Sequence, residues 1–161
     1  MNWMANARGN FVNSTNTRPE GEMWITWDAT TGLPSLHRKL RTHAAVTKGV
    51  PYMFQVTAAY PGGLTAACAT NVRAYVAFAN ETKSAAAYVD CIVAGYVEDA
   101  AASGTIASDA NVEVINSGVA VIDDGSTTTQ TANTLGHALG AAASNLVDIW
   151  VYESPIAIAA S

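Results

Sequence analysis

The clearest structural signal in this chain is a pair of short β-prone runs separated by turn residues. Residues 111–126 read NVEVINSGVAVIDDGS, in which VEVI and VAVI flank an Asn-Ser-Gly turn and Asp-Asp-Gly ends the second run. Asn, Asp, Ser and Gly favour tight turns because they adopt positive φ or bond locally to the backbone. The segment therefore predicts a β-hairpin followed by a turn.

Similar short runs fill the chain from residue 44 onward. Residues 44–58 hold two β-prone runs around a Lys-Gly pair, and 71–79 and 147–153 alternate between two sets of side chains. A helix is the alternative for 71–79, although alternation favours a strand, and LGHALGAAASNL (135–146) is compatible with one helical turn. Together these patterns predict a mainly β protein with a small β-sandwich or barrel body over residues 44–161.

The N-terminal residues 1–43 differ in character from this body. They are rich in Asn, Thr and Gly but carry spaced aromatic residues, which solvated disordered tails usually lack. One interpretation is an extended arm that lies on a partner; the other is a strand-bearing start, EMWITWD (22–28), packed on the protein's own core. The arm interpretation gives these candidate contact residues: Trp3, Arg8, Phe11, Arg18, Trp24 and Trp27.

Residues 33–43, LPSLHRKLRTH, have two possible structures. Pro34 suits the first turn of a helix, with leucines following on one side, but an extended conformation is equally compatible with the sequence. In the extended case, the charge run RKLR is expected to form a solvated face.

Charge and composition restrict the partners. Half of the residues are hydrophobic and 13% are charged, which indicates a surface partly covered by a partner. Residues 1–48 hold six basic and three acidic residues, whereas the remainder holds two basic and ten acidic residues. An acidic body with no dense basic cluster beyond RKLR predicts no nucleic-acid partner.

The sequence predicts neither secretion nor membrane insertion. The first ten residues contain no apolar signal segment, and the most apolar stretch, AAAYVDCIVAGYV, is short and interrupted by Asp90. Without a secretory route, Cys68 and Cys91 are expected to be reduced, buried thiols rather than a disulfide.

One polar segment contains the residue types of a hydrolytic triad. Residues 122–140, IDDGSTTTQTANTLGHALG, include Ser126, His137 and two aspartates, Asp123 and Asp124. Ser126 follows a turn rather than occupying a Gly-x-Ser-x-Gly elbow, and nothing in the intervening loop fixes the geometry of a triad. We therefore predict no catalytic site and expect His137 to be a surface or hydrogen-bonded residue.

Metal and cofactor motifs are also missing from the sequence. His37 and His43 are six residues apart, too far for a zinc-binding pair on one helical face, and no Gly-rich phosphate loop is present. The sequence predicts no metal, no cofactor and no enzymatic activity.

Residues 44–153 resemble the small decoration, or cement, proteins that coat the capsids of tailed bacteriophages. The resemblance rests on AVTKGVPYMFQVTA, on VDCIVAGYVEDAAASGTIASDANVEVINSGVAVIDDGS, and on LGHALGAAASNLVDIWVYE. It implies a β-rich fold, no enzymatic activity, a homotrimer seated where major capsid protein subunits meet, and a place on the virion surface after assembly in the host cytoplasm.

A second functional class remains open. Trp150 and Tyr152 lie on one face of a predicted strand, where aromatic rings can stack on sugars or pack in a core or interface. The alternative hypothesis is therefore a glycan- or receptor-binding module of a phage tail or fibre.

Overall fold

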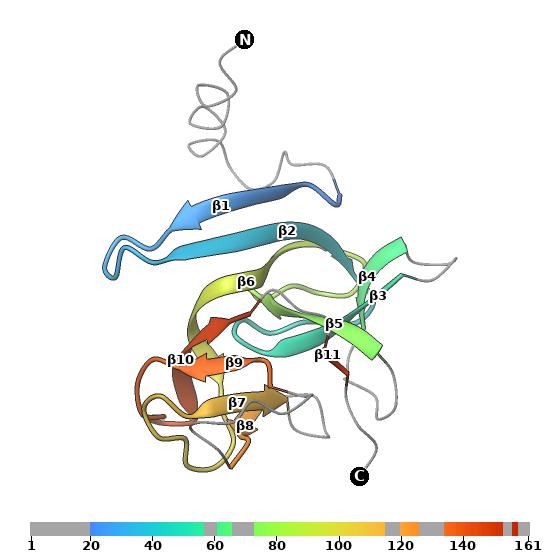
Figure 1. Cartoon of the computed structure of the whole chain (residues 1–161). Coiled ribbons are helices and arrows are strands. Elements are labelled where there is room, and N and C mark those ends of the chain that lie inside the picture. The colour runs from blue at the N-terminus through green and yellow to red at the C-terminus, as the bar shows by residue number, and fades with distance from the viewer. Residues whose placement is uncertain are drawn as a thin grey trace.

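The described part of the chain consists of strands and the turns between them (Figure 1). No helix occurs among these residues, so the predicted mainly β class is confirmed. The computed structural model describes residues 20–56, 61–65, 73–114, 120–125, 134–152 and 156–157.

Within these described ranges, eleven strands form one sheet. In chain order they are β1 (Met23–Trp27), β2 (Pro34–Thr42), β3 (Pro51–Val56), β4 (Pro61–Thr65), β5 (Arg73–Ala79), β6 (Tyr88–Ala101), β7 (Asn111–Val114), β8 (Val121–Asp123), β9 (Gly136–Ala138), β10 (Leu146–Val151) and β11 (Ile156–Ala157).

The sheet follows the order β1-β2-β4-β3-β5-β6-β10-β9-β7-β8, with β11 on β5. All pairings are antiparallel except β2–β4. Because β6 also pairs with β2, the sheet curls back on itself, yet it is not a closed barrel: β1 and β8 end the strand order in the described chain. Figure 1 shows β1 and β2 along one side and β7 to β10 gathered at the other.

The core consists of two hydrophobic clusters on opposite faces of the β5–β6 pair. Phe78 and its cross-strand partner Ile92 belong to the larger cluster, which β7, β9 and β10 complete. Ala79 and its partner Cys91 belong to the smaller cluster, which includes Leu40 of β2. Successive side chains of a strand point to opposite faces, so the apolar run of β6 supplies both clusters.

The prediction of a reduced, buried thiol is confirmed for Cys91. Cys91 is a free, fully buried thiol, and burial raises its pKa, which keeps it protonated. Cys68 lies outside the described residues.

Two local predictions hold in the body. Strands β7 and β8 pair with Val112 opposite Asp123 and Val114 opposite Val121, which is the hairpin expected from VEVI and VAVI. In β10, Val147, Ile149 and Val151 are buried while Asp148 and Trp150 between them are half-buried, as the alternation predicted. Both segments could be predicted because their pairing or burial period is local in sequence.

Residues 135–146 contain no helical turn, contrary to the expectation from their alanines. They form β9 and then a tight turn in which Ser144 and Asn145 have φ of 53° and 63°. Ala143 and Leu146 exchange two backbone hydrogen bonds of 2.9 Å across this turn. Positive φ at both central residues is the geometry that matches the twist of a short hairpin, and Asn tolerates it well.

The described part of the predicted arm, residues 20–43, belongs to the sheet. For residues 22–28, the strand-bearing interpretation is therefore the correct one, and for residues 33–43 it is the extended alternative. Strand β2 pairs with β6 from Ser35 to Arg41 and buries Leu40 completely. The charge run is not wholly solvated either: Arg41 is exposed but Lys39 is buried. Residues 1–19 lie outside the described residues, and for them the arm stays a prediction.

Replacing Glu113 with glutamine is expected to stabilise the protein at neutral pH. Burial, and then the charge of Asp124, raise the pKa of Glu113 above its ordinary value. A raised carboxyl pKa means that the fold disfavours the charged form, so Glu113 costs stability above its folded pKa and costs nothing below about pH 4, the ordinary Glu range. Thermal unfolding of both proteins at neutral and acid pH checks this: equal differences at both pH values would contradict it.

Candidate contact surface

Strand β1 exposes an apolar side chain at every second position. Met23, Ile25 and Trp27 are 51%, 46% and 67% exposed, while Trp24 and Thr26 between them are half-buried. Large apolar side chains are rarely left in water in such a row unless the surface binds something. This alternation makes the outer face of β1 the strongest candidate for a contact surface.

The outer face continues onto β2. Trp27 lies opposite Pro34, and Ile25 lies opposite Leu36, both half-buried. Opposite residues in an antiparallel pair share one face of the sheet, so these side chains adjoin one another. We call this set the β1–β2 apolar surface: Met23, Ile25, Trp27, Pro34 and Leu36.

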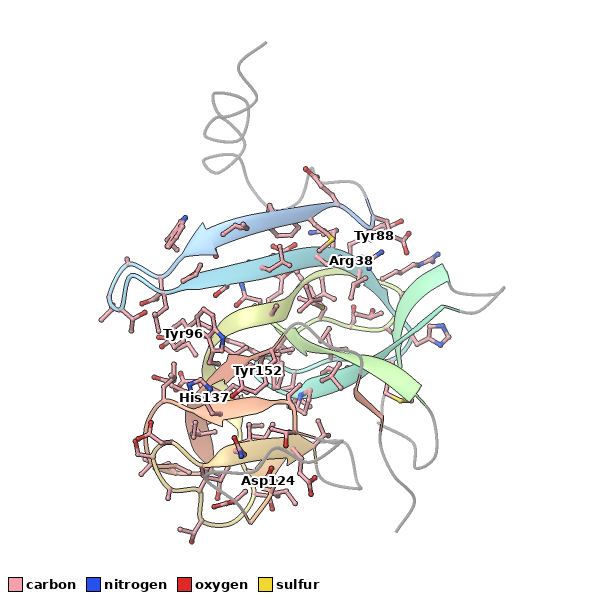
Figure 2. All side chains as sticks on the ribbon, viewed as in Figure 1. Arg38, Tyr88, Tyr96, Asp124, His137 and Tyr152 are labelled. Carbon is pink, nitrogen blue, oxygen red and sulfur yellow. The ribbon has the colours of Figure 1, made fainter. Side chains whose placement is uncertain are left out.

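Arg38 marks one end of this surface, opposite Met23. Figure 2 shows Arg38 near Tyr88, which lies opposite Arg41 at one end of the β2–β6 ladder, and Tyr96 toward the other end. The surface thus has an apolar centre with a basic residue at one end.

The inner face of β1 packs against the protein itself. Trp24 stacks on His37 with ring centroids 5.3 Å apart and an angle of 18° between the rings. A hydrogen bond of 2.8 Å joins Thr26 Oγ1 to His37 Nε2. These contacts hold β1 on β2 and leave Trp24 much less accessible than Trp27.

The turn after β1 is organised by Asp28. Its Oδ1 accepts hydrogen bonds from the amides of Thr30 and Thr31 at 3.0 and 2.6 Å, and from Thr31 Oγ1 at 2.8 Å. The backbone bond from Thr31, followed by its hydroxyl bond, holds the pKa of Asp28 below its ordinary value. Asp28 is therefore an anion at neutral pH, immediately beyond Trp27.

A cavity of about 220 Å³ lies between the β1–β2 hairpin and β6. It contains two carboxylates, of which Glu98 pairs with Lys48 at 3.6 Å. The volume is below the range of about 300–1,000 Å³ for small-molecule sites, so the cavity is too small for a typical cofactor. Its lining comes from Thr26, Trp27, Asp28, Ala29, Ser35, His37, Asn80, Ile92, Tyr96 and Glu98.

The predicted contact residues separate into two groups. Trp24 and Trp27 lie in one strand but on opposite faces, so only Trp27 belongs to the β1–β2 apolar surface. Met23 and Ile25 were missed, although the alternation in MWITW is the signal that identifies them. Four predicted residues lie outside the described chain: Trp3, Arg8, Phe11 and Arg18.

Among the described residues, Asp123, Asp124 and His137 do not come together as a catalytic triad. Asp123 Oδ1 accepts a bond from the Gly125 amide at 2.8 Å, and Asp124 Oδ2 accepts one from Thr134 Oγ1 at 2.9 Å. His137 Nδ1 is hydrogen-bonded to Tyr152 Oη at 3.0 Å, as expected for a hydrogen-bonded histidine. Ser126 lies outside the described residues, and the absence of enzymatic activity stays a prediction.

The aromatic residues Trp150, in β10, and Tyr152, just after it, are partly packed. Trp150 lies opposite His137 in the β9–β10 pair, and the rings of His137 and Tyr152 are 5.7 Å apart (Figure 2). Trp150 and Tyr152 are both half-buried. Their arrangement fits packed aromatics better than an open platform for sugar rings.

The described residues offer neither a metal site nor a membrane-spanning helix. They contain no group of three or more His, Cys, Asp or Glu side chains that could hold a metal ion. They also include no helix with the length and apolarity needed to cross a membrane.

Comparison with known proteins identifies a similar fold and no family. No protein-family model and no curated protein matches this chain. Among solved structures, it is similar to the crystal structure of the head fiber gp8.5 N base of bacteriophage phi29. The match has a TM-score of 0.53 and 14% sequence identity, and it covers 74% of this chain and 95% of that chain. The two chains share a fold.

Proposed function

We propose that this chain is a structural protein of a bacteriophage virion. Its fold likeness to the head fiber base carries the proposal, since the match spans 95% of that domain. Within this class, we propose a decoration, or cement, protein that binds the outer capsid surface and stabilises contacts between major capsid protein subunits. It acts as a homotrimer, without enzymatic activity and without nucleic-acid or membrane partners, and assembles on the virion in the host cytoplasm.

The β1–β2 apolar surface supports this role. Burying a large apolar side chain fully contributes about 1.5–3 kcal/mol, and Met23, Ile25 and Trp27 are each about half or more exposed. A complex of micromolar affinity needs about 8 kcal/mol, and its energy usually concentrates in a few aromatic and apolar anchors. Burying three such anchors in one strand, with Trp27 among them, contributes a binding free energy of this order once neighbouring contacts are added.

A second candidate function is a glycan- or receptor-binding module of a phage fibre. The structural neighbour is itself named a head fiber, which favours this alternative. The two functions differ in copy number: a cement protein occupies the shell at high, symmetric copy number, whereas a fibre module is present at few copies. Quantitative mass spectrometry of purified particles separates them.

Substituting the outer face of β1 is expected to weaken capsid binding. The variant Trp27→Ala/Ile25→Thr removes two of the three anchors. One hot-spot anchor alone is worth about 2 kcal/mol, which corresponds to a roughly 30-fold higher Kd, so we expect at least this loss. The measurement is co-sedimentation of the protein with capsids of the phage that encodes it. Leu146→Ala is the matched control, because Leu146 is 40% exposed on β10, away from this surface.

The control is expected to bind like the wild type. Equal binding of the Trp27→Ala/Ile25→Thr variant would show that another surface holds the capsid. If the wild-type protein itself fails to bind capsids, the cement function is wrong.

A further inference from the structure

The backbone of β1 offers hydrogen-bonding groups on its outer edge. Asp28 N donates to Leu33 O at 2.9 Å, and Lys39 N donates to Glu22 O at 2.9 Å. In an antiparallel pair, hydrogen-bonded positions alternate with positions whose groups point away. Even-numbered residues of β1 therefore bond to β2, whereas the N–H and C=O groups of the odd-numbered residues face outward.

The outward-facing residues are the same three that expose apolar side chains: Met23, Ile25 and Trp27. Proteins usually protect such an edge with charges, proline or a bulge, and an unprotected one is a template for another strand. Residues 23–27 hold no charge and no proline, and their register with β2 is regular. Among the described strands, none pairs with this edge.

The opposite end of the sheet differs. Strand β8 has only three residues, its Val121 is fully buried, and Ala102 forms a bridge to Val121. A short, covered edge is a normal protective arrangement. The exposure of backbone and apolar side chains together is thus a property of β1.

The charges around β1 indicate what it binds. If two copies paired antiparallel through Ile25, Glu22 of each copy would lie opposite Asp28 of the other. Like charges directly opposite each other on neighbouring strands are destabilising. This arrangement disfavours a second copy. Arg38 lies beside Met23 at one end of β1, whereas Asp28 lies at the other, so the charges favour an extended segment with apolar residues at its centre and a basic residue at the end that meets Asp28.

We propose that β1 binds an extended segment of the major capsid protein by β-strand addition, and that this segment is apolar at its centre and basic at the end that meets Asp28. The partner's identity rests on the proposed function. The backbone of Met23, Ile25 and Trp27 supplies the hydrogen bonds, and their side chains supply the apolar contact, as in other cases of strand addition.

The substitution Ile25→Pro tests the backbone part of this proposal. Proline removes the outward N–H of residue 25 and leaves the bonds to β2, which come from residues 24 and 26. Proline is tolerated on an edge strand for the same reason. The matched control, Ile25→Val, keeps both the N–H and an apolar β-branched side chain.

We expect Ile25→Pro to weaken co-sedimentation with capsids at least tenfold, and Ile25→Val to change it less than threefold. If the proline variant is folded and binds as tightly as the valine variant, strand addition is wrong. If the wild type does not bind capsids, it is the proposed function that fails.

Amide hydrogen exchange of the wild-type protein gives a second test that needs no variant. On capsids, the amides of Met23, Ile25 and Trp27 should become protected, while those of Trp24 and Thr26, already bonded to β2, should change little. Unchanged exchange at the three odd positions in capsid-bound protein would overturn the proposal. A dimer of the free protein that Ile25→Pro converts to monomer would overturn it as well, because the occupant would then be a second copy.

Discussion

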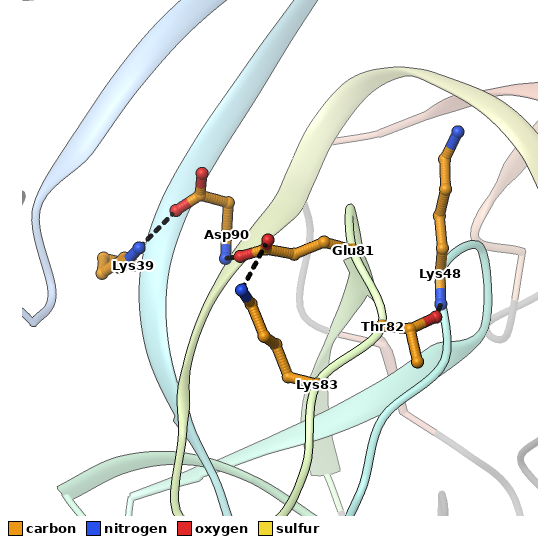
Figure 3. A network of polar contacts seen from close by, with 6 residues as sticks. All are labelled: Lys39, Lys48, Glu81, Thr82, Lys83 and Asp90. Atoms are coloured by element: carbon orange, nitrogen blue, oxygen red, sulfur yellow. Dashed lines mark hydrogen bonds and ion pairs between the residues drawn. The ribbon is translucent and has the colours of Figure 1, made fainter. Parts of the chain in front are cut away.

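Replacing Asp90 with leucine is expected to lower the free energy of unfolding by about 3–5 kcal/mol, the usual cost of removing one partner of a buried ion pair. Lys39 Nζ lies 3.0 Å from Asp90 Oδ1, and the two side chains are 2% and 4% exposed (Figure 3). Without the carboxylate of Asp90, the buried ammonium group of Lys39 loses the ion pair at 3.0 Å. Denaturation in urea measures the change.

Two further variants test whether the loss of stability comes from the loss of the buried ion pair. The double variant Lys39→Met/Asp90→Leu should recover much of the loss, because an apolar pair of similar volume often replaces a buried ion pair without cost. Lys83→Met breaks the 2.9 Å pair with Glu81, whose side chains are about one-third exposed, and should cost at most about 1 kcal/mol. If Asp90→Leu costs no more than Lys83→Met, the buried pair does not contribute as we infer.

The pair also joins two parts of the sequence that look unrelated. Lys39 and Asp90 lie opposite each other in the β2–β6 ladder, 51 residues apart in the chain. A slip of one residue between these strands would turn Lys39 to the other face and leave its charge without this partner. The ion pair therefore favours one register for attaching the N-terminal strands to the body.

This long-range pairing explains why the sequence left two interpretations open between residues 20 and 43. The hairpin of β7 and β8 could be predicted because its two strands are neighbours in the chain. In contrast, the run RKLR gives no local sign that Lys39 is buried and Arg41 exposed, since the difference depends on Asp90. A charge run normally indicates a solvated face, and here one member departs from that rule because it has a buried partner.

The contact surface was partly predictable for a similar reason. The aromatic residues drew attention to Trp24 and Trp27, but only pairing with β2 assigns them to opposite faces. Once MWITW is known to be a strand, alternation alone places Met23 and Ile25 beside Trp27. That β1 lies at the edge of the sheet follows from the strand order and not from any local pattern.

Replacing Gly95 with alanine is expected to destabilise the protein by about 2–5 kcal/mol. Gly95 has φ of 86°, a conformation that costs a residue with a Cβ about 1–2 kcal/mol. A Cβ there would also collide with the backbone oxygen of Pro34, and overpacking of this kind costs about 1–3 kcal/mol. The residue lies between β2 and β10, opposite Ser35 and Val151, so neither neighbouring strand can move away freely.

Two other glycines separate these contributions when urea denaturation is measured for all three variants. Gly125 has a similar φ of 81° but nothing within 4 Å of a built Cβ, so Gly125→Ala should show the conformational cost alone, about 1–2 kcal/mol. Gly140 has neither constraint, and Gly140→Ala should stay within about 0.5 kcal/mol of the wild type. The excess of Gly95→Ala over Gly125→Ala then measures how closely β2 approaches β6. An excess of zero would mean that the strands separate at little cost and that the β2–β6 contact is looser than its hydrogen-bond register indicates.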